Sequence, residues 1–255
     1  MKNIWIICRR ELSSYFSSPI AWLLLTMYSV IFGWIFWNFL AEFIKQGIDM
    51  EMMGQSSPMN LNEQIIRPLL GTSSFLGLFM IPLISMRLFA EEKRNGTIEL
   101  LATSPVRDIE IILGKWFSAT LLYCWIILFA SINFLFLFRY GHPDWKPMLI
   151  TFLGVFLQGA ALLAIGTFIS TLTKNQIIAG ALTFGACLLL WVFSWVSSYD
   201  SSSWAQVFSY MSVITHFDAF DRGVLSSKDA IYYLSVIFLG LFFTARSMES
   251  LRWRS

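Results

Sequence analysis

The stretch MRLFAEEKRNGTIELLATSPVRDIEIILGK, residues 86–115, is a densely charged segment between two long apolar runs. Its ten charged side chains are Arg87, Glu91, Glu92, Lys93, Arg94, Glu99, Arg107, Asp108, Glu110 and Lys115. The flanking runs, residues 69–86 and 116–138, contain no charged side chain. Since a membrane-spanning helix needs about 20 mostly apolar residues, the pattern predicts a polar segment held at a membrane surface between two spans.

The composition extends this prediction to the whole chain. Of its 255 residues 56% are hydrophobic and only 13% are charged, whereas soluble domains average about 25% charged residues. We expect an all-α integral membrane protein with a single transmembrane domain over residues 1–255. The predicted spans are residues 20–41, 69–86, 116–138, 148–173, 177–196 and 230–247. The last apolar run is short, so its helix is expected to extend at one end.

Residues 2–18 are too charged to cross a membrane. On a helical wheel the apolar side chains share one half and Lys2, Arg9 and Arg10 the other, with Glu11 the one charge on the apolar side. This pattern is typical of a helix lying in the membrane interface; the alternative is an extension of the first span. Ser18-Pro19 is expected to end the helix, because proline disfavours helical geometry in the residue before it.

The distribution of Lys and Arg predicts the orientation. If the chain crosses six times, the two ends, segment 87–115 and the turn at Lys174 share one side and hold twelve Lys and Arg residues, against six in the opposite loops. Positive charge accumulates in cytoplasmic loops, so both termini and segment 87–115 are expected in the cytoplasm. The polar loops 42–69 and 198–229 then face outward. Trp204–Phe217 has no charged side chain besides His216 and could re-enter the membrane.

The sequence lacks the motifs of common chemistries. It has no GxxxxGK[ST] phosphate loop, no GxSxG, no HExxH and no CxxC among its three cysteines. We interpret His142 and His216 as loop residues rather than metal ligands. No ionisable residue lies near the centre of a predicted span, and it is such residues that mark ion pathways in membrane proteins. We therefore expect no catalytic, cofactor or metal site, which disfavours an intramembrane enzyme and an ion-coupled carrier. Energy for movement would come from another chain.

Small residues in two spans indicate close helix packing. They lie in GAALLAIG, residues 159–166, and AGALTFGA, residues 179–186. This packing could lie within one subunit or at a subunit interface.

Segment 87–115 itself reads as short helices joined by turns. Residues 91–94 are expected to emerge into water, and Asn95-Gly96 signals a turn. Thr97 can cap a short helix with Glu99 in its first turn, and Ser104-Pro105 can start another. Such helices could form a docking surface; the alternative is a solvated loop that packs only on its own domain.

This segment closely resembles the cytoplasmic coupling region of ABC-2-type transporter permeases, nearest to the gliding-motility-associated and copper-enzyme-maturation-like branch. RRELSSYFSSPIAW (9–22), STLTKNQ (170–176) and HFDAFDRGVLSSKDAIYYLS (216–235) resemble the same family in the same order. The resemblance implies an ABC-2, or type V exporter-like, fold with an N-terminal connecting helix and cytoplasmic coupling helices. The implied coupling residues are Glu91, Glu92, Gly96, Thr97, Glu99, Leu100, Thr103, Ser104 and Pro105.

The resemblance also implies partners and a location. The chain would be a permease subunit in the bacterial inner membrane that pairs with a second permease subunit, as a homo- or heterodimer. A cytoplasmic ABC ATPase would bind ATP, so the chain itself needs no cofactor. An auxiliary extracytoplasmic membrane protein and membrane lipids are further expected partners, and nucleic acid is not. The alternative function is a non-transporting anchor or mechanical transmitter between a cytoplasmic ATPase and an extracytoplasmic partner.

Overall fold

The computed structural model describes residues 2–54, 60–97, 106–141, 143–199 and 203–252, and this part of the chain is helical with no strand. Six helical segments are long and apolar enough to cross a membrane. They are Pro19–Met52, Asn62–Asn95, Asp108–Tyr140, Trp145–Ser170, Gln176–Trp195 and Ser227–Ser250. The predicted all-α fold with six spans is confirmed.

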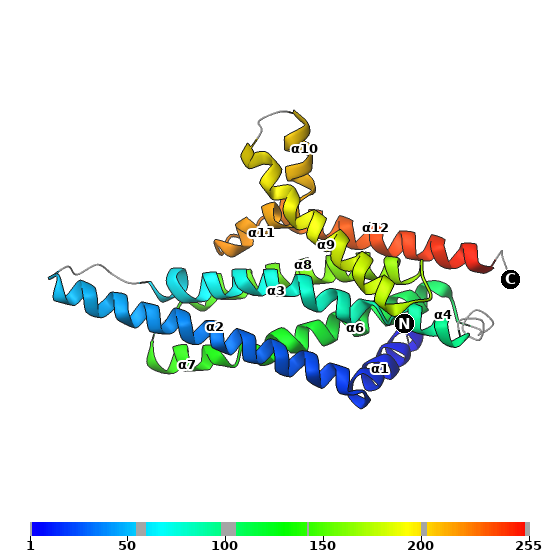
Figure 1. Cartoon of the computed structure of the whole chain (residues 1–255), viewed down its shortest axis with the longest axis horizontal. Helices are drawn as coiled ribbons and strands as arrows, with labels where there is room; N and C mark the ends of the chain where they lie inside the picture. Colours follow the sequence, from blue (N-terminus) through cyan, green and yellow to red (C-terminus); the bar gives the residue numbers. More distant parts are fainter. Residues whose placement is uncertain (1, 55–59, 98–105, 142, 200–202, 253–255) are drawn as a thin grey trace.

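The long helices run along the long axis of the molecule, as Figure 1 shows. They are α2 (Pro19–Met52), α3 (Arg67–Ser85, preceded by a π-helical turn at Asn62–Ile66), α6 (Asp108–Ala130), α8 (Trp145–Ser170) and α12 (Ser227–Arg252). Helix α9 (Gln176–Tyr199) leans away from this bundle together with α10 (Ser203–Met211). Helices α1 (Lys2–Ser17) and α4 (Ala90–Asn95) lie at the end where both termini lie.

Helix α8 is the centre of the bundle because small residues let its neighbours approach. A Cβ on Gly159 would lie 1.9 Å from the Tyr123 ring of α6, and one on Gly166 would lie 2.3 Å from Ser85 Oγ of α3. In α12, a Cβ on Gly240 would lie 2.8 Å from the backbone of Ala164. The small residues of 159–166 therefore serve packing within this chain.

The first spanning helix, α2, is much longer than the predicted span 20–41. The polar residues after Ala41 were expected to form a loop, but α2 continues through Gly47 to Met52. Across Gly47, the apolar side chains of Ile44 and Ile48 continue the helical spacing on one face. A single glycine costs only about 1 kcal/mol inside a helix.

The third span also differs from its predicted bounds, 116–138. Helix α6 begins at Asp108 and stops at Ala130, and a turn at residues 131–132 separates it from α7 (Asn133–Tyr140). Ser131 Oγ donates to the Ile127 carbonyl over 2.7 Å, and Asn133 Nδ2 donates to the Ala130 carbonyl over 2.8 Å. These side-chain bonds compete with the helical backbone bonds and explain the interruption.

The predicted outward loop 198–229 contains two helices, α10 and α11 (Val213–Asp221). His216 was read as a loop residue, but it lies in α11 and its side chain is 3% exposed. Its Nδ1 lies 2.6 Å from Asp229 Oδ1, its Nε2 lies 2.9 Å from the Tyr210 carbonyl oxygen, and its ring stacks on Tyr232. His216 thus joins α10, α11 and α12. Among the described residues, no cluster of His, Cys, Asp and Glu could hold a metal ion.

Candidate functional site

The charged segment begins where α3 ends at Ser85, and its first helix is α4. The start of α4 is capped from another helix, since the backbone N–H groups of Phe89 and Ala90 both donate to Ser170 Oγ of α8 over 3.0 Å. These donors belong to the first turn of a helix and have no partner within it. Ser170 therefore fixes the start of α4 to the end of α8.

The sequence of α4 suits its short length. Glu91 and Glu92 lie in its first turn and Lys93 and Arg94 in its last, as the helix dipole favours. Gly96 ends the helix with φ +71°, a left-handed conformation that glycine adopts without strain, and the Thr97 N–H donates to the Glu92 carbonyl over 3.0 Å. The expected turn at Asn95-Gly96 is present.

Lys115 lies at the centre of a cluster of charges, which we call the charge cluster: Arg10, Glu11, Glu92 and Lys115. Its Nζ lies 2.8 Å from Glu92 Oε1 of α4 and 3.2 Å from Glu11 Oε1 of α1. Arg10 approaches Glu11 to 2.9 Å and Glu92 to 4.0 Å. Two cations thus face two carboxylates, and the cluster joins α1, α4 and α6.

The Lys115 side chain is only 2% exposed, and those of Glu11 and Glu92 are 17% and 16% exposed. A lysine this buried needs a partner of opposite charge. Burial alone would raise the pKa of the Glu11 carboxyl, but Lys115 and the hydrogen bond from Arg10 outweigh it and hold that pKa below the ordinary value. Glu11 is therefore ionised at neutral pH. We expected Glu92 to emerge into water, and the structure corrects this because Lys115 draws its carboxylate inward.

Gly114 explains how α1 comes close enough to form the cluster. A Cβ at this position would lie 2.8 Å from Cβ and Cγ2 of Ile7 and 3.1 Å from the Ile4 carbonyl oxygen. The two helices pack directly against each other here, and the adjacent Lys115 then meets Glu11. Gly114 therefore allows α1 to approach α6, and Lys115 forms the ion pair that this approach permits.

A second set of contacts ties the same end of the bundle together. Tyr15 of α1 donates its hydroxyl to the Ile84 carbonyl over 2.9 Å, and the Arg87 guanidinium lies 5.5 Å from the Tyr15 ring centre. Arg87 also pairs with Glu91 at 2.9 Å. Between these groups and the charge cluster lies a polar cavity of about 190 Å³. Among the described residues, Arg87 Nη1 and Glu92 Oε2 have no hydrogen-bond partner, so this cavity has unused polar capacity.

The other side of α4 contacts α8 and, through it, α12. Lys93 donates its ammonium to the Thr171 carbonyl, and Thr171 Oγ1 donates to Ser247 Oγ of α12 over 2.8 Å. With Ser170, these bonds hold the start of α4 and Lys93 against the end of α8.

The structure brings together some of the predicted coupling residues. Glu91, Glu92, Gly96 and Thr97 lie in and directly after α4. Five others lie outside the described residues: Glu99, Leu100, Thr103, Ser104 and Pro105. The start of a helix expected at Ser104-Pro105 therefore also lies outside the described residues. Helix α6 begins at Asp108, where the Glu110 carboxylate accepts from the Arg107 N–H over 3.3 Å. Sequence reasoning missed Glu11 and Ser170 as members of the site.

Fold and site together define a multi-pass membrane protein with six candidate spans and a charge cluster at one end, whose sequence holds no phosphate loop. The family model of the ABC-2 family transporter protein matches residues 5–244. The chain therefore belongs to the ABC-2 transporter family, as its membrane component, and ATPase activity lies in a partner subunit. A comparison with curated protein sequences gave no match.

Proposed function

We propose that this permease subunit receives ATP-driven motion through segment 87–115 and passes it to its spanning helices, to export or move a substrate. The observation that carries this proposal is the attachment of α4, which joins α1 and α6 through the charge cluster and α8 through Ser170 and Thr171. A short helix fixed to three neighbouring helices on its inner side cannot move alone. Force on α4 is therefore transmitted to the helices that hold it.

The proposed contact with the ATPase is the outer face of α4 and the residues that follow it. Glu91, Gly96 and Thr97, together with Glu99, Leu100, Thr103, Ser104 and Pro105, would face the partner. Glu92 would have a different role, since its carboxylate turns toward Lys115 and is 16% exposed. We assign Glu92 to transmission of the motion rather than to ATPase binding.

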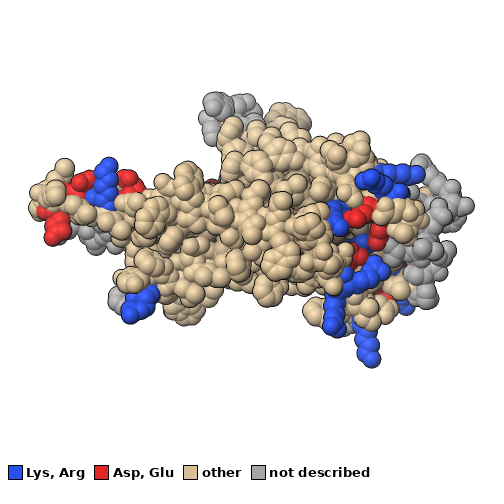
Figure 2. Space-filling model, turned by 60° about the horizontal axis from the view of Figure 1, so that its bottom comes forward, with Lys and Arg blue, Asp and Glu red and all other residues tan. Residues whose placement is uncertain are grey.

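The proposed orientation places α1, α4 and both termini in the cytoplasm of a bacterial cell, in its inner membrane. The excess of Lys and Arg at this end supports it. Figure 2 shows charged side chains at the two ends of the molecule and an uncharged surface between them, as a membrane-spanning body requires. The basic face of α1, with Lys2, Arg9 and Arg10, then lies near lipid phosphates.

The resemblance of segment 87–115 supports a finer placement within the family. We assign the chain to the gliding-motility-associated and copper-enzyme-maturation-like branch. It would pair with a second permease subunit, as a homo- or heterodimer, and would work with an auxiliary extracytoplasmic membrane protein.

A second candidate function is a mechanical transmitter that moves no substrate. The observation that favours it is the length of α2, which continues past its predicted span to Met52 and projects from the end opposite α1 (Figure 1). This projection offers an extracytoplasmic partner a rigid surface. A continuous lined cavity through the assembled dimer would support transport, whereas a sealed subunit interface would support the transmitter.

The proposed function is tested by co-expression with the partner ATPase, measuring co-purification and ATP hydrolysis. We expect Glu99→Lys to weaken co-purification and Glu92→Lys to reduce stimulated hydrolysis while the complex remains. Arg246→Glu, on an exposed residue near the C-terminus, is the matched charge-reversal control. If Glu92→Lys and Glu99→Lys leave both measurements unchanged, the coupling role of segment 87–115 is wrong.

A further inference from the structure

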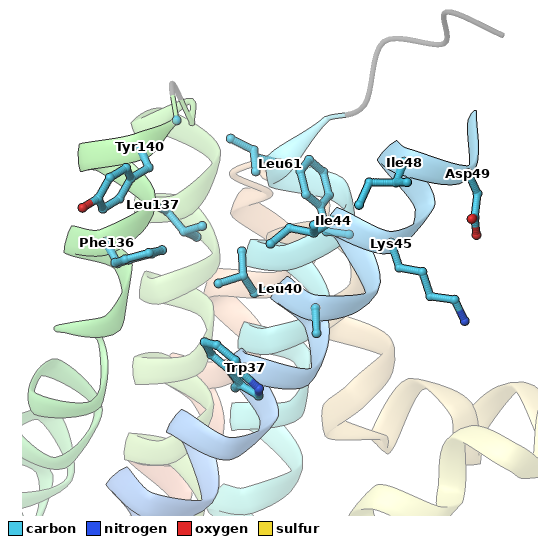
Figure 3. Close-up of a pocket in the computed structure, with 13 residues that line it drawn as sticks. Trp37, Leu40, Ile44, Lys45, Ile48, Asp49, Leu61, Phe136, Leu137 and Tyr140 are labelled. Atoms are coloured by element: carbon cyan, nitrogen blue, oxygen red, sulfur yellow. The ribbon is translucent and has the colours of Figure 1, made fainter. Parts of the chain in front are cut away.

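An apolar groove lies at the end of the bundle opposite the charge cluster. It has a volume of about 830 Å³ and lies between the last turns of α2 and helix α7. Figure 3 shows its two walls: Leu40 and Ile44 of α2 face Phe136 and Leu137 of α7, and Leu61 lies between them. The volume is in the range of small-molecule sites, and the lining has the apolar character of an acyl-chain site.

The upper part of this groove lies beyond the predicted span 20–41 of α2. Helix α2 has 34 residues, and at 1.5 Å per residue it is about 51 Å long, against a hydrocarbon thickness of about 30 Å. Its start follows the interfacial helix α1, so the turns after Leu40 rise above the far boundary. Ile44 and Ile48 are nevertheless 53% and 48% exposed. Apolar surface in contact with water needs a cover.

We propose that this groove binds an acyl chain of a phospholipid from the adjoining membrane leaflet. The lower end of the groove, at Trp37 and Phe136, belongs to the predicted spans 20–41 and 116–138, so a lipid chain would enter it from the side. The rim carries Lys45 and Asp49, one cation and one anion four residues apart on α2. This pair matches the phosphate and the amine of a zwitterionic headgroup. The inference concerns lipid binding and does not depend on the coupling role of segment 87–115.

The test places the photoreactive amino acid benzoylphenylalanine in the full chain, reconstituted in phosphatidylethanolamine vesicles. Position 48 lies in the upper groove, position 46 lies on α2 at the same height outside the groove, and position 30 is an exposed position within the predicted span. After irradiation, the adducts are identified by mass spectrometry. We expect phospholipid adducts at positions 30 and 48 and a several-fold lower yield at position 46.

An additional variant fills the groove. Ala41 lines it, so Ala41→Trp should abolish the adduct at position 48 while Gln46→Trp, outside the groove, leaves it unchanged. Three results would overturn the proposal: equal lipid yields at positions 48 and 46, an adduct at position 48 with a second copy of the chain, or a lipid adduct that survives Ala41→Trp. The comparison of positions 48 and 46 stands without the tryptophan variants.

Discussion

Lys115 Nζ of α6 lies 2.8 Å from Glu92 Oε1 of α4, and this contact joins the charged segment to the third spanning helix. The lysine is nearly buried, and Glu11 of α1 completes the neutralisation of its charge from the other side. Helices α1, α4 and α6 thus share one ammonium group.

Removing the lysine should destabilise the protein. Lys115→Met leaves two partly buried carboxylates without their main cation, and breaking a buried ion pair costs about 3–5 kcal/mol. We expect the lower end of this range, because both carboxylates retain some exposure. The measurement is the thermal unfolding temperature of the detergent-solubilised chain. Arg246→Met breaks an exposed pair with Glu249 and should cost about 0–1 kcal/mol; equal effects of both variants would contradict the account.

Glu11 should also make stability depend on acid, whereas burial outweighs Lys115 at Glu92 and raises the pKa of that carboxyl. The pKa of Glu11 is below its ordinary value of 4.5 in the folded chain, so its contribution is fully present above about pH 4.5 and is lost as the pH falls through the folded-state pKa. Glu11→Gln removes this contribution. We expect the unfolding temperature of the variant to lie below that of the unchanged protein at pH 7 and the two to converge in acid. A constant difference across this range would exclude Glu11 as the titrating group.

The position of α1 should depend on its close packing against Gly114 of α6. Gly114→Ala places a methyl group 2.8 Å from Ile7 and should loosen α1. Trypsin cleavage after Arg9 and Arg10 in the solubilised chain should then become faster. Gly33→Ala is the control, since a Cβ there meets nothing within 4 Å and alanine favours a helix. Unchanged cleavage in Gly114→Ala would show that α1 does not depend on this contact.

His216 should hold the hairpin of α10 and α11 on α12. Both ring nitrogens face oxygen atoms, those of Asp229 and of the Tyr210 carbonyl. A carbonyl oxygen can only accept, so Nε2 donates to Tyr210 and Nδ1 faces the carboxylate. His216→Ala should lower the unfolding temperature by more than Lys228→Ala, which removes only a cation lying over the Tyr210 ring. The reverse order would contradict an anchoring role for the histidine.

Apolar runs and charge distribution predicted the six spans, since the membrane sets both their length and their flanks. The exact helix ends could not be predicted, because Gly47 in α2 and the turn after Ala130 depend on neighbouring side chains. Part of the candidate site could also be predicted from the sequence. Glu11 was the one charge on the apolar side of its helix, and the structure shows that this position faces Lys115. Ser170 gave no signal, because its role depends on α4 meeting the end of α8.

The central claim, that segment 87–115 receives the ATPase, is tested most directly by cross-linking. Benzoylphenylalanine replaces Arg94, an exposed residue of α4, in the full chain co-expressed with its ATPase, and Lys45 at the other end of the bundle is the control position. The account predicts an adduct with the ATPase from position 94, with a yield that changes when ATP is added, and no such adduct from position 45. An ATPase that co-purifies with the chain but forms no adduct from position 94, with or without ATP, would contradict it.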